Sequence, residues 1–505
     1  MTSPLRIDRI LGDRPFAEIG EPALAVAAEG RGLLGMAGTH KFGMAPVGVY
    51  DVGDLACRAL LRSRYPVHAM AFHPLLPLLV VGTGRYDGGY FFEGELLLLN
   101  LETGVATSLI EDPLGRQVLA LEWLTGRELR VLMAPPDDWQ DKDAWGTGHV
   151  AVVRRPDWAV VPPRSILWEE LTGPRVAAPR PDGREEARRT VSGLGTDGDP
   201  RRDVRAVEEL SDGRILATLD RVQAECWLPS GERQWTVPDD KGGSDIVVAP
   251  DERSVWVGLV RPEWEEPPQS VVQLSLDDGA QLDHLTLSAP ASLVRCVDGL
   301  PAIAPAQEAG ERSRLRVRRG SRIYLREIDR ERGWTPAPSE AWLAAAELKN
   351  PTVTGRPREP AERDIRRLLP YSWTPGETHF AGPGVETMDG TLVHTGTVYN
   401  GQGLQPGGSF VVRRRVSSEQ PDWIFRTDRA ATDLDADAET VYITYGDGEI
   451  VALHPDDGTV RWRGHLTIAA VPAIPTALTV AGPGRLLIGT SDGRILDCSI
   501  RPDQD

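Results

Sequence analysis

The sequence is short of lysine, aromatic residues and positive charge. Four lysines occur in 505 residues, aromatic residues make up 6%, and 74 Asp and Glu outnumber 56 Lys and Arg, for a formal net charge of -18. An acidic surface repels nucleic-acid phosphates, so we expect no nucleic-acid partner. Nearly all basic residues are arginine, a bias typical of GC-rich bacteria such as actinobacteria. With 41% hydrophobic residues, the chain can bury a large core.

Cysteines and long apolar runs are also scarce. The four cysteines, Cys57, Cys226, Cys296 and Cys498, lie far apart, which fits neither a zinc site nor a disulfide framework. We expect reduced thiols that are mostly buried. No run of about 18 apolar residues could cross a membrane, and the first residues do not resemble a secretory signal. We therefore expect a cytoplasmic protein with no membrane insertion.

Glycine and proline, in contrast, are abundant, with 52 and 41 residues, and they punctuate a repeat. Residues 441–462 form three apolar runs separated by glycine turns, and the same figure returns 45 residues later at 486–500. Earlier copies occur at 78–104 and 255–279. Each run has the length and the Val, Leu and Ile content of a short β-strand.

The spacing of the turn residues supports the repeat. The ten-residue step from Gly448 to Gly458 recurs at residues 94–104. The four-residue step from Gly458 to Trp462 recurs at residues 231–235. Because several linked matches are not expected by chance, the sequence predicts a repeat architecture.

Each repeat predicts four antiparallel strands. One such sheet cannot cover both of its own faces, so the sheets must pack side by side, and a closed ring leaves only short edges. The predicted fold is therefore all-β, a single β-propeller over residues 1–505. The repeats resemble those of WD40-like and PQQ-like (quinoprotein-type) β-propellers, and residues 441–462 are most similar to the PQQ-like repeat.

The repeat predicts nine blades, or seven or eight if the weaker copies at 22–62 and 291–335 are not blades. The ninth copy, residues 475–500, has three strands, and residues 5–10 supply its fourth, so that the two chain ends close the ring. The other blades are expected at residues 22–62, 67–111, 117–171, 203–238, 244–288, 291–335, 376–427 and 429–467.

Two segments interrupt the repeat. Residues 172–203 are rich in Pro, Gly and Arg and lack periodicity, which predicts a flexible loop between blades. Residues 336–370 predict a helical insertion, in which Ser339 caps a helix over 340–349 and a second helix covers 361–369.

Three motifs match the residue pattern of a catalytic, cofactor-binding or metal-binding site but lack other features that such a site needs. Residues 193–198 match a dinucleotide fingerprint without its strand and helix, and residues 489–493 match a nucleophile elbow but run into a strand. Asp433, Asp435 and Asp437 have the spacing of a calcium loop that lacks its glycine and final glutamate. We expect no catalytic residue, no metal and no cofactor.

Arginines alternate with other residues over two adjacent strands. On a hairpin this alternation predicts a positive stripe along one side. The stripe is either a solvated outer strand or a site for an acidic partner or a phosphate. Its members are Arg314, Arg316, Arg318, Arg322 and Arg326.

Aromatic residues, often beside acidic ones, gather in the predicted connections between second and third strands. These connections all emerge on one face of a propeller, where exposed rings either pack locally or anchor a partner. The predicted partner-binding residues are Phe42, Tyr86, Tyr90, Phe91, Trp139, Trp145, Trp264 and Tyr399.

The sequence favours a non-catalytic cytoplasmic scaffold that binds another protein of a cytosolic complex through this aromatic and acidic face. The alternative is an enzyme or small-ligand binder that uses the mouth of the central channel. The PQQ-like resemblance implies a quinone as that ligand, whereas Trp and Tyr side chains would also suit a carbohydrate.

Overall fold

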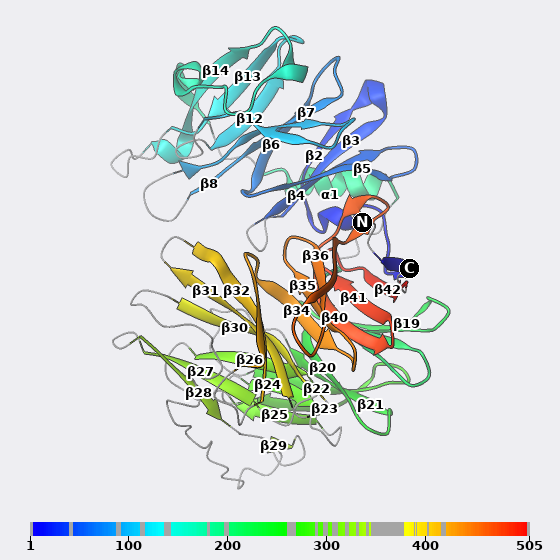
Figure 1. The fold of residues 1–505 in the computed structure, drawn as a ribbon. Helices are drawn as coiled ribbons and strands as arrows, with labels where there is room; N and C mark the ends of the chain where they lie inside the picture. The colour runs from blue at the N-terminus through cyan, green and yellow to red at the C-terminus, as the bar shows by residue number, and fades with distance from the viewer. Residues whose placement is uncertain are drawn as a thin grey trace. The chain divides into compact units, whose positions relative to one another are not determined.

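The computed structural model describes residues 4–39, 44–86, 92–111, 117–135, 143–178, 182–195, 201–259, 269–287, 291–295, 301–305, 312–318, 323–329, 333–339, 343–344, 378–387, 389, 391–400, 403–415 and 421–501 (Figure 1). Within these ranges the chain forms strands, five short 3-10 helices and one α-helix, α1 (Arg184–Gly193). In the same ranges, no helix is long and apolar enough to cross a membrane.

The chain divides into two compact units, and each is described by itself. The larger unit comprises residues 1–13, 201–468 and 472–505. The smaller unit comprises residues 14–200 and 469–471.

The smaller unit contains three antiparallel sheets of four strands, which confirm the blades expected at 22–62 and 67–111. The third sheet extends past the expected end at 171, because its fourth strand lies at 175–177. Their first strands contact one another in the order β2, β6, β12. The sheets are β2 (Pro22–Ala28), β3 (Leu33–Gly38), β4 (Ala45–Asp51) and β5 (Cys57–Ser63); β6 (Val67–Phe72), β7 (Leu78–Thr83), β10 (Leu96–Asn100) and β11 (Ala106–Ser108); and β12 (Val118–Trp123), β13 (Glu128–Met133), β14 (Thr147–Arg154) and β15 (Arg175–Ala177).

Strand β10 shows why the sheets of this unit pack face to face. Its four leucines are all buried, and alternate residues of a strand point to opposite faces. Leu97 and Leu99 join the core against the first sheet, whereas Leu96 and Leu98 join the core against the third. A sheet covered on both faces has a continuous apolar run, as this strand does.

The shorter elements of the smaller unit lie in the connections. The hairpin strands β8 (Arg85–Tyr86) and β9 (Phe92–Glu93) lie between β7 and β10 in the chain. The 3-10 helices are η1 (Ala17–Ile19), η2 (Glu29–Arg31), η3 (Ala144–Gly146), η4 (Trp158–Val160) and η5 (Trp168–Leu171).

The expected flexible loop over 172–203 was wrong where β15 and α1 form. Helix α1 packs against β2 and buries Ala187 and Val191, with Val191 in a cluster that covers the first sheet. Gly193 is the last residue of this helix, so a helix ends at the first glycine of the motif, where the dinucleotide fingerprint has a strand.

The larger unit contains four more four-stranded sheets, at or close to their expected positions. They are β16 (Arg202–Glu209), β17 (Ile215–Asp220), β18 (Val222–Trp227) and β19 (Arg233–Pro238); β20 (Gly243–Val248), β21 (Ser254–Leu259), β22 (Gln269–Ser275) and β23 (Gln281–Leu287); β34 (Ala431–Ala436), β35 (Val441–Tyr445), β36 (Glu449–Leu453) and β37 (Val460–His465); and β40 (Pro475–Gly482), β41 (Arg485–Thr490) and β42 (Ile495–Ile500) with β1 (Leu5–Leu11). The short strands β38 (Thr467–Ile468) and β39 (Val471–Pro472) lie between β37 and β40 in the chain.

The pairing of β1 with β42 confirms the expected closing strand. Leu5 pairs with Ile500 and Leu11 with Ile495, in antiparallel register. The first strands of the larger unit contact one another in the order β30, β34, β40, β16 and β20. The sheet that contains both chain ends therefore packs beside the β16 sheet, although residues 14–200 separate β1 from β16 in the sequence.

The blade expected at 291–335 was wrong as a single four-stranded sheet. Strands β24 (Ala291–Arg295) and β25 (Pro301–Pro305) form a sheet with β29 (Leu343–Ala344). Strands β26 (Arg312–Arg318), β27 (Ile323–Asp329) and β28 (Gly333–Ser339) instead extend the sheet of β30 (Thr378–Glu386), β31 (Thr391–Asn400), β32 (Gly403–Arg415) and β33 (Trp423–Thr427). Strand β29 interrupts the first expected helix, and the second, 361–369, lies outside the described residues.

Buried polar side chains join neighbouring sheets of the larger unit. Asp433 and Asp435 on β34 accept hydrogen bonds from the backbone N–H groups of Leu478 and Val480 on β40, at 2.7 and 2.8 Å. Asp437 instead accepts from backbone N–H groups in its own turn. Among the described residues, no group of three or more His, Cys, Asp or Glu could hold a metal ion. Asp433 and Asp435 thus act as links between sheets.

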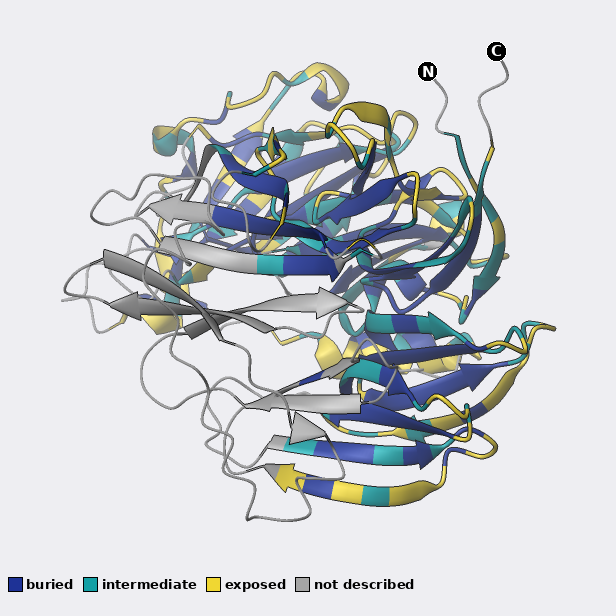
Figure 2. Ribbon diagram, turned by 60° about the horizontal axis from the view of Figure 1, so that its bottom comes forward, coloured by how far each residue is buried: buried dark blue, intermediate teal, exposed yellow. Residues whose placement is uncertain are grey.

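Figure 2 shows buried residues along the strands of the described sheets and exposed residues mainly in their connections. A polar link such as that of Asp433 matters in this setting because an unpaired backbone N–H in a buried sheet costs free energy.

Candidate functional site

Three aromatic rings from connections in two neighbouring sheets meet in the smaller unit, and we call them the aromatic ledge: Tyr86, Phe92 and Trp145. The ring centroids of Tyr86 and Phe92 lie 5.2 Å from that of Trp145 and 5.5 Å from each other. Two of the three contacts are edge-to-face, an arrangement that aromatic rings favour. Phe92 is fully buried, whereas 52% of Trp145 is exposed.

The buried part of the ledge packs against apolar residues. Phe92 belongs to a buried cluster with Leu119, Ala134, Ala144 and Ala178. Tyr86 and Phe92 are opposite each other on the β8–β9 hairpin, and Trp145 lies in η3 immediately before β14. The exposed indole is therefore fixed by its contacts with two other rings and by a short, structured connection.

Charged residues flank the same hairpin. The Arg85 guanidinium pairs with Glu93 at 3.2 Å and lies 5.5 Å from the centre of the buried Tyr65 ring. Burial raises the pKa of the Glu95 carboxyl, although the nearby charge of Arg64 opposes this effect. The ledge thus adjoins groups of both charge signs.

Two polar side chains, the half-buried His68 and the buried Gln117, fix the start of the hairpin. His68 Nε2 lies 2.8 Å from the Gly84 carbonyl oxygen and 3.0 Å from Gln117 Nε2. A Cβ at Gly84 would meet the Gln117 side chain at 2.3 Å, so only glycine fits there. These contacts position the backbone two residues before Tyr86.

The structure brings together two of the predicted partner-binding residues, Tyr86 and Trp145. Tyr399 lies in strand β31, where it pairs with Leu404, so this position belongs to a strand and not to a loop. Phe42, Tyr90, Phe91, Trp139 and Trp264 lie outside the described residues. Phe92 was missed, although it closes the same predicted connection.

The predicted arginine stripe falls on β26, which carries Arg314, Arg316 and Arg318, and on β27, which carries Arg326. Strand β26 pairs with β27 so that Arg314 is opposite Leu325 and Ser313 is opposite Arg326. Arg316 and Arg318 lie farther along β26, and Arg322 lies outside the described residues. Anion binding by these arginines stays a prediction.

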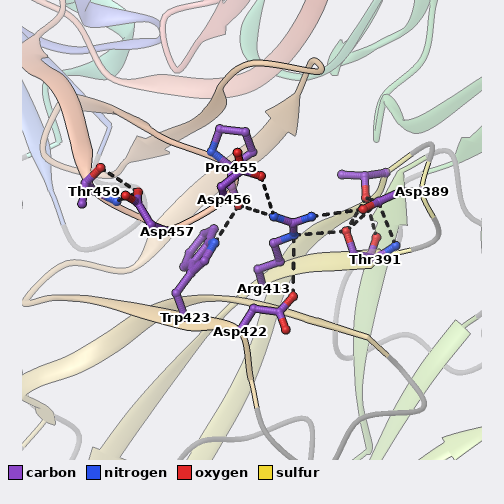
Figure 3. A network of polar contacts seen from close by, with 10 residues as sticks. Asp389, Thr391, Arg413, Asp422, Trp423, Pro455, Asp456, Asp457 and Thr459 are labelled. Carbon is purple, nitrogen blue, oxygen red and sulfur yellow. Dashed lines mark hydrogen bonds and ion pairs between the residues drawn. The ribbon is translucent and has the colours of Figure 1, made fainter.

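Figure 3 shows a polar network around Arg413 that joins the β30–β33 strands to the β36–β37 turn. The Pro455 carbonyl accepts from Arg413 and from Trp423 Nε1, both at 2.7 Å, and Arg413 also pairs with Asp389 at 3.1 Å. Burial works to raise the pKa of Asp389, but hydrogen bonds from Thr387 and Thr391 and the charge of Arg413 outweigh it and hold that pKa far below its usual range.

An arginine and a tryptophan thus share one backbone carbonyl of a neighbouring sheet, and we call this arrangement a latch. A second latch lies between the β16 and β20 sheets. There the Leu276 carbonyl accepts from Arg214 at 2.7 Å and from Trp235 Nε1 at 3.1 Å. In each latch the accepting carbonyl is three residues before a glycine of positive φ, Gly279 or Gly458. A Cβ on either glycine would lie less than 3 Å from the tryptophan ring. These tryptophans therefore serve the packing of sheets.

A buried ion pair lies where the chain returns to the larger unit. Arg201 donates to Glu225 at 2.6 Å and to the Gly493 carbonyl at 3.0 Å, and Trp227 Nε1 donates to Glu225 at 2.8 Å. The Arg201 and Glu225 side chains are almost completely buried. A Cβ at Gly12 would overlap the Arg201 guanidinium, which explains the glycine at the end of β1.

The repeated four-stranded sheets, the last of them completed by the N-terminal strand, define an all-β protein built from propeller-type blades. No protein-family model matches the chain, and no curated protein matches it. Among solved structures, Saccharomyces cerevisiae Sqt1 aligns with 87% of this chain and 97% of its own, at 11% identity and a TM-score of 0.28. A TM-score this low carries no argument, so the class rests on the sheets themselves.

Proposed function

We propose that this protein is a non-catalytic scaffold of the WD40-like or PQQ-like type, which binds another protein of a cytosolic complex through the aromatic ledge. The observation that supports the proposal is the state of Trp145: half of its surface faces solvent, while its ring is fixed against Tyr86 and Phe92.

Such a tryptophan suits a protein interface for two reasons. Tryptophan and tyrosine are enriched among the residues that contribute most to protein binding, because each buries a large area at a small entropic cost. A ring that is already held in place loses little further freedom when a partner covers it. The Arg85–Glu93 pair beside the ledge would form part of a polar rim.

The test is affinity capture from the native cytosol with the full chain and three variants. Trp145→Ala should lose the stoichiometric partner, because it removes the exposed indole, while Trp145→Phe should retain part of the binding. Ile424→Ala, at an exposed position of β33 in the larger unit, is the matched control and should retain the partner fully.

The thermal stability of each variant decides how the capture is interpreted. Trp145→Ala should change the free energy of unfolding by no more than about 1 kcal/mol, as expected of a surface site. A larger loss would mean that Trp145 serves packing alone. Equal capture by wild type and Trp145→Ala, or recovery of only a bound quinone or carbohydrate, would contradict the proposal.

A further inference from the structure

Exposed aliphatic residues gather in one set of connections of the smaller unit. The turns between first and second strands and between third and fourth strands emerge on the same side of a meander, and we call that side of this unit the turn face. Its exposed aliphatic residues are Val52, Leu75, Val105, Leu124 and Val160. In the larger unit, corresponding turns carry exposed acids such as Asp212, Asp277 and Asp456.

The turns of this face are locked to one another across all three sheets. Arg31, from the first sheet, donates to the Leu76 and His73 carbonyls of the second at 2.6 and 2.8 Å. His73 Nε2 in turn lies 3.0 Å from the Gly126 carbonyl of the third sheet. Leu75 is thus presented on a rigid turn, so that little conformational freedom is lost when a partner covers it.

A groove opens beside Leu75 between the first two sheets. Its volume is about 480 Å³, and its apolar lining comes from Leu33, Val49, Leu75, Pro77 and Leu101. Arg31, Arg58 and Glu102 complete the lining. Leu75 is 80% exposed, so the same small patch carries a protruding aliphatic side chain and an apolar recess.

We propose that the turn face binds a second copy of this chain, with Leu75 of each copy in the groove of the other. A two-fold interface brings one patch against itself, so it requires a patch that complements its own shape and charge. Leu75 and the groove supply the complementary shape, and Arg58 and Glu102 supply opposite charges on the same rim. Arg58 already contacts Asp51 and Asp54, but exposed ion pairs of this kind exchange at little cost.

The first test measures the mass of the full chain by sedimentation equilibrium over a range of concentrations. Wild type should pass from monomer to dimer as concentration rises. Leu75→Asp should raise the dissociation constant at least about tenfold, because it places a charge in the partner's apolar groove. Leu282→Asp, which changes an equally apolar side chain exposed on β23 of the larger unit, should leave the constant unchanged.

The second test uses charge reversal. Arg58→Glu and Glu102→Arg should each weaken self-association, since each variant brings like charges together at both ends of the two-fold interface. An equal mixture of the two variants should associate again, because every contact across the mixed interface then joins opposite charges. A merely misfolded variant would not be rescued by mixing.

Three results would overturn the inference: a monomer at every concentration, equal effects of Leu75→Asp and Leu282→Asp, or a mixture that stays monomeric. Trp145→Ala should leave self-association intact, so this inference can fail or stand independently of the proposed function.

Discussion

The turn glycine between third and fourth strands has the same backbone conformation in both units but different surroundings. Gly458 of the larger unit and Gly104 of the smaller unit have φ of 71° and 70°. A Cβ at Gly458 would lie 2.7 Å from the Trp423 ring, whereas a Cβ at Gly104 would meet nothing within 4 Å. One blade plan thus supports two kinds of turn: one closed by a neighbouring sheet, and one that leaves Val105 open to solvent.

In the larger unit this turn packs against a neighbouring sheet, whereas in the smaller unit it is exposed to solvent. In the larger unit, Arg413 and Trp423 hold the turn that contains Pro455, and the exposed positions beside it are acidic. In the smaller unit, Arg31 and His73 join the turns closer to the strands, and the tips carry aliphatic residues.

The largest expected effect lies at the buried ion pair of the larger unit. Arg201→Met removes the closest guanidinium from the buried Glu225 carboxylate and leaves it with Arg233 at 3.9 Å, which should lower the free energy of unfolding by about 3 kcal/mol. The double variant Arg201→Met/Glu225→Gln should recover much of the loss, since the glutamine still accepts from Trp227. Urea unfolding measures both, and equal losses in the single and double variants would show that the charge is not what matters.

The two turn glycines give a matched pair of smaller effects. Gly104→Ala should cost about 1 kcal/mol, because alanine disfavours a positive φ. Gly458→Ala should cost roughly 2–4 kcal/mol, since the new methyl group must also displace Trp423. If urea unfolding gives the same loss for both, the latch does not constrain its turn.

His73 should make the smaller unit sensitive to acid. Its Nδ1 accepts from the N–H groups of Leu75 and Leu76, so the folded state requires a neutral ring, and burial lowers the pKa of His73. Below the ordinary histidine pKa of about 6.5, the unfolded chain binds a proton that the folded chain does not. Stability should therefore fall as pH drops below that value, until the lowered folded pKa is reached.

His73→Asn is the control for this pH dependence. The asparagine oxygen can accept from the same turn without titrating, so the unfolding free energy of the variant should change less between pH 7 and pH 5. Hydrogen exchange in residues 67–83 reports on the smaller unit, and an unchanged pH dependence would exclude His73 as its source.

The smallest effect is a labelling difference between the units that leaves stability unchanged. Cys57 of the smaller unit is partly exposed, whereas burial raises the pKa of the Cys226 thiol to about 11 and also raises the pKa of Cys498. A thiol reagent at pH 8 should modify Cys57 in the native chain and reach Cys226 and Cys498 only on unfolding. Rapid native labelling of Cys226, located by mass spectrometry, would contradict its burial.

The sequence predicted most blades because glycine turns at a fixed spacing force the chain to reverse. It also predicted the pairing of β1, because residues 475–500 lacked a fourth strand. It did not reveal α1, whose buried positions Ala187 and Val191 are too few to give a helical pattern in an Arg- and Glu-rich segment.

The candidate site was predictable in part. Aromatic residues in the predicted connections between second and third strands indicated Tyr86 and Trp145. The contact between their rings joins two sheets, however, and depends on how those sheets pack. The Arg201–Glu225 pair and the Pro455 latch likewise join residues that no local pattern relates.

The most direct test of the central claim is hydrogen exchange of the full chain with and without its captured partner. Backbone amides of the β8–β9 hairpin and of η3 with the start of β14 should be protected in the complex, while the β34 and β40 sheets of the larger unit exchange as before. Protection confined to the larger unit, or none near Tyr86 and Trp145, would contradict the claim that the aromatic ledge binds the partner.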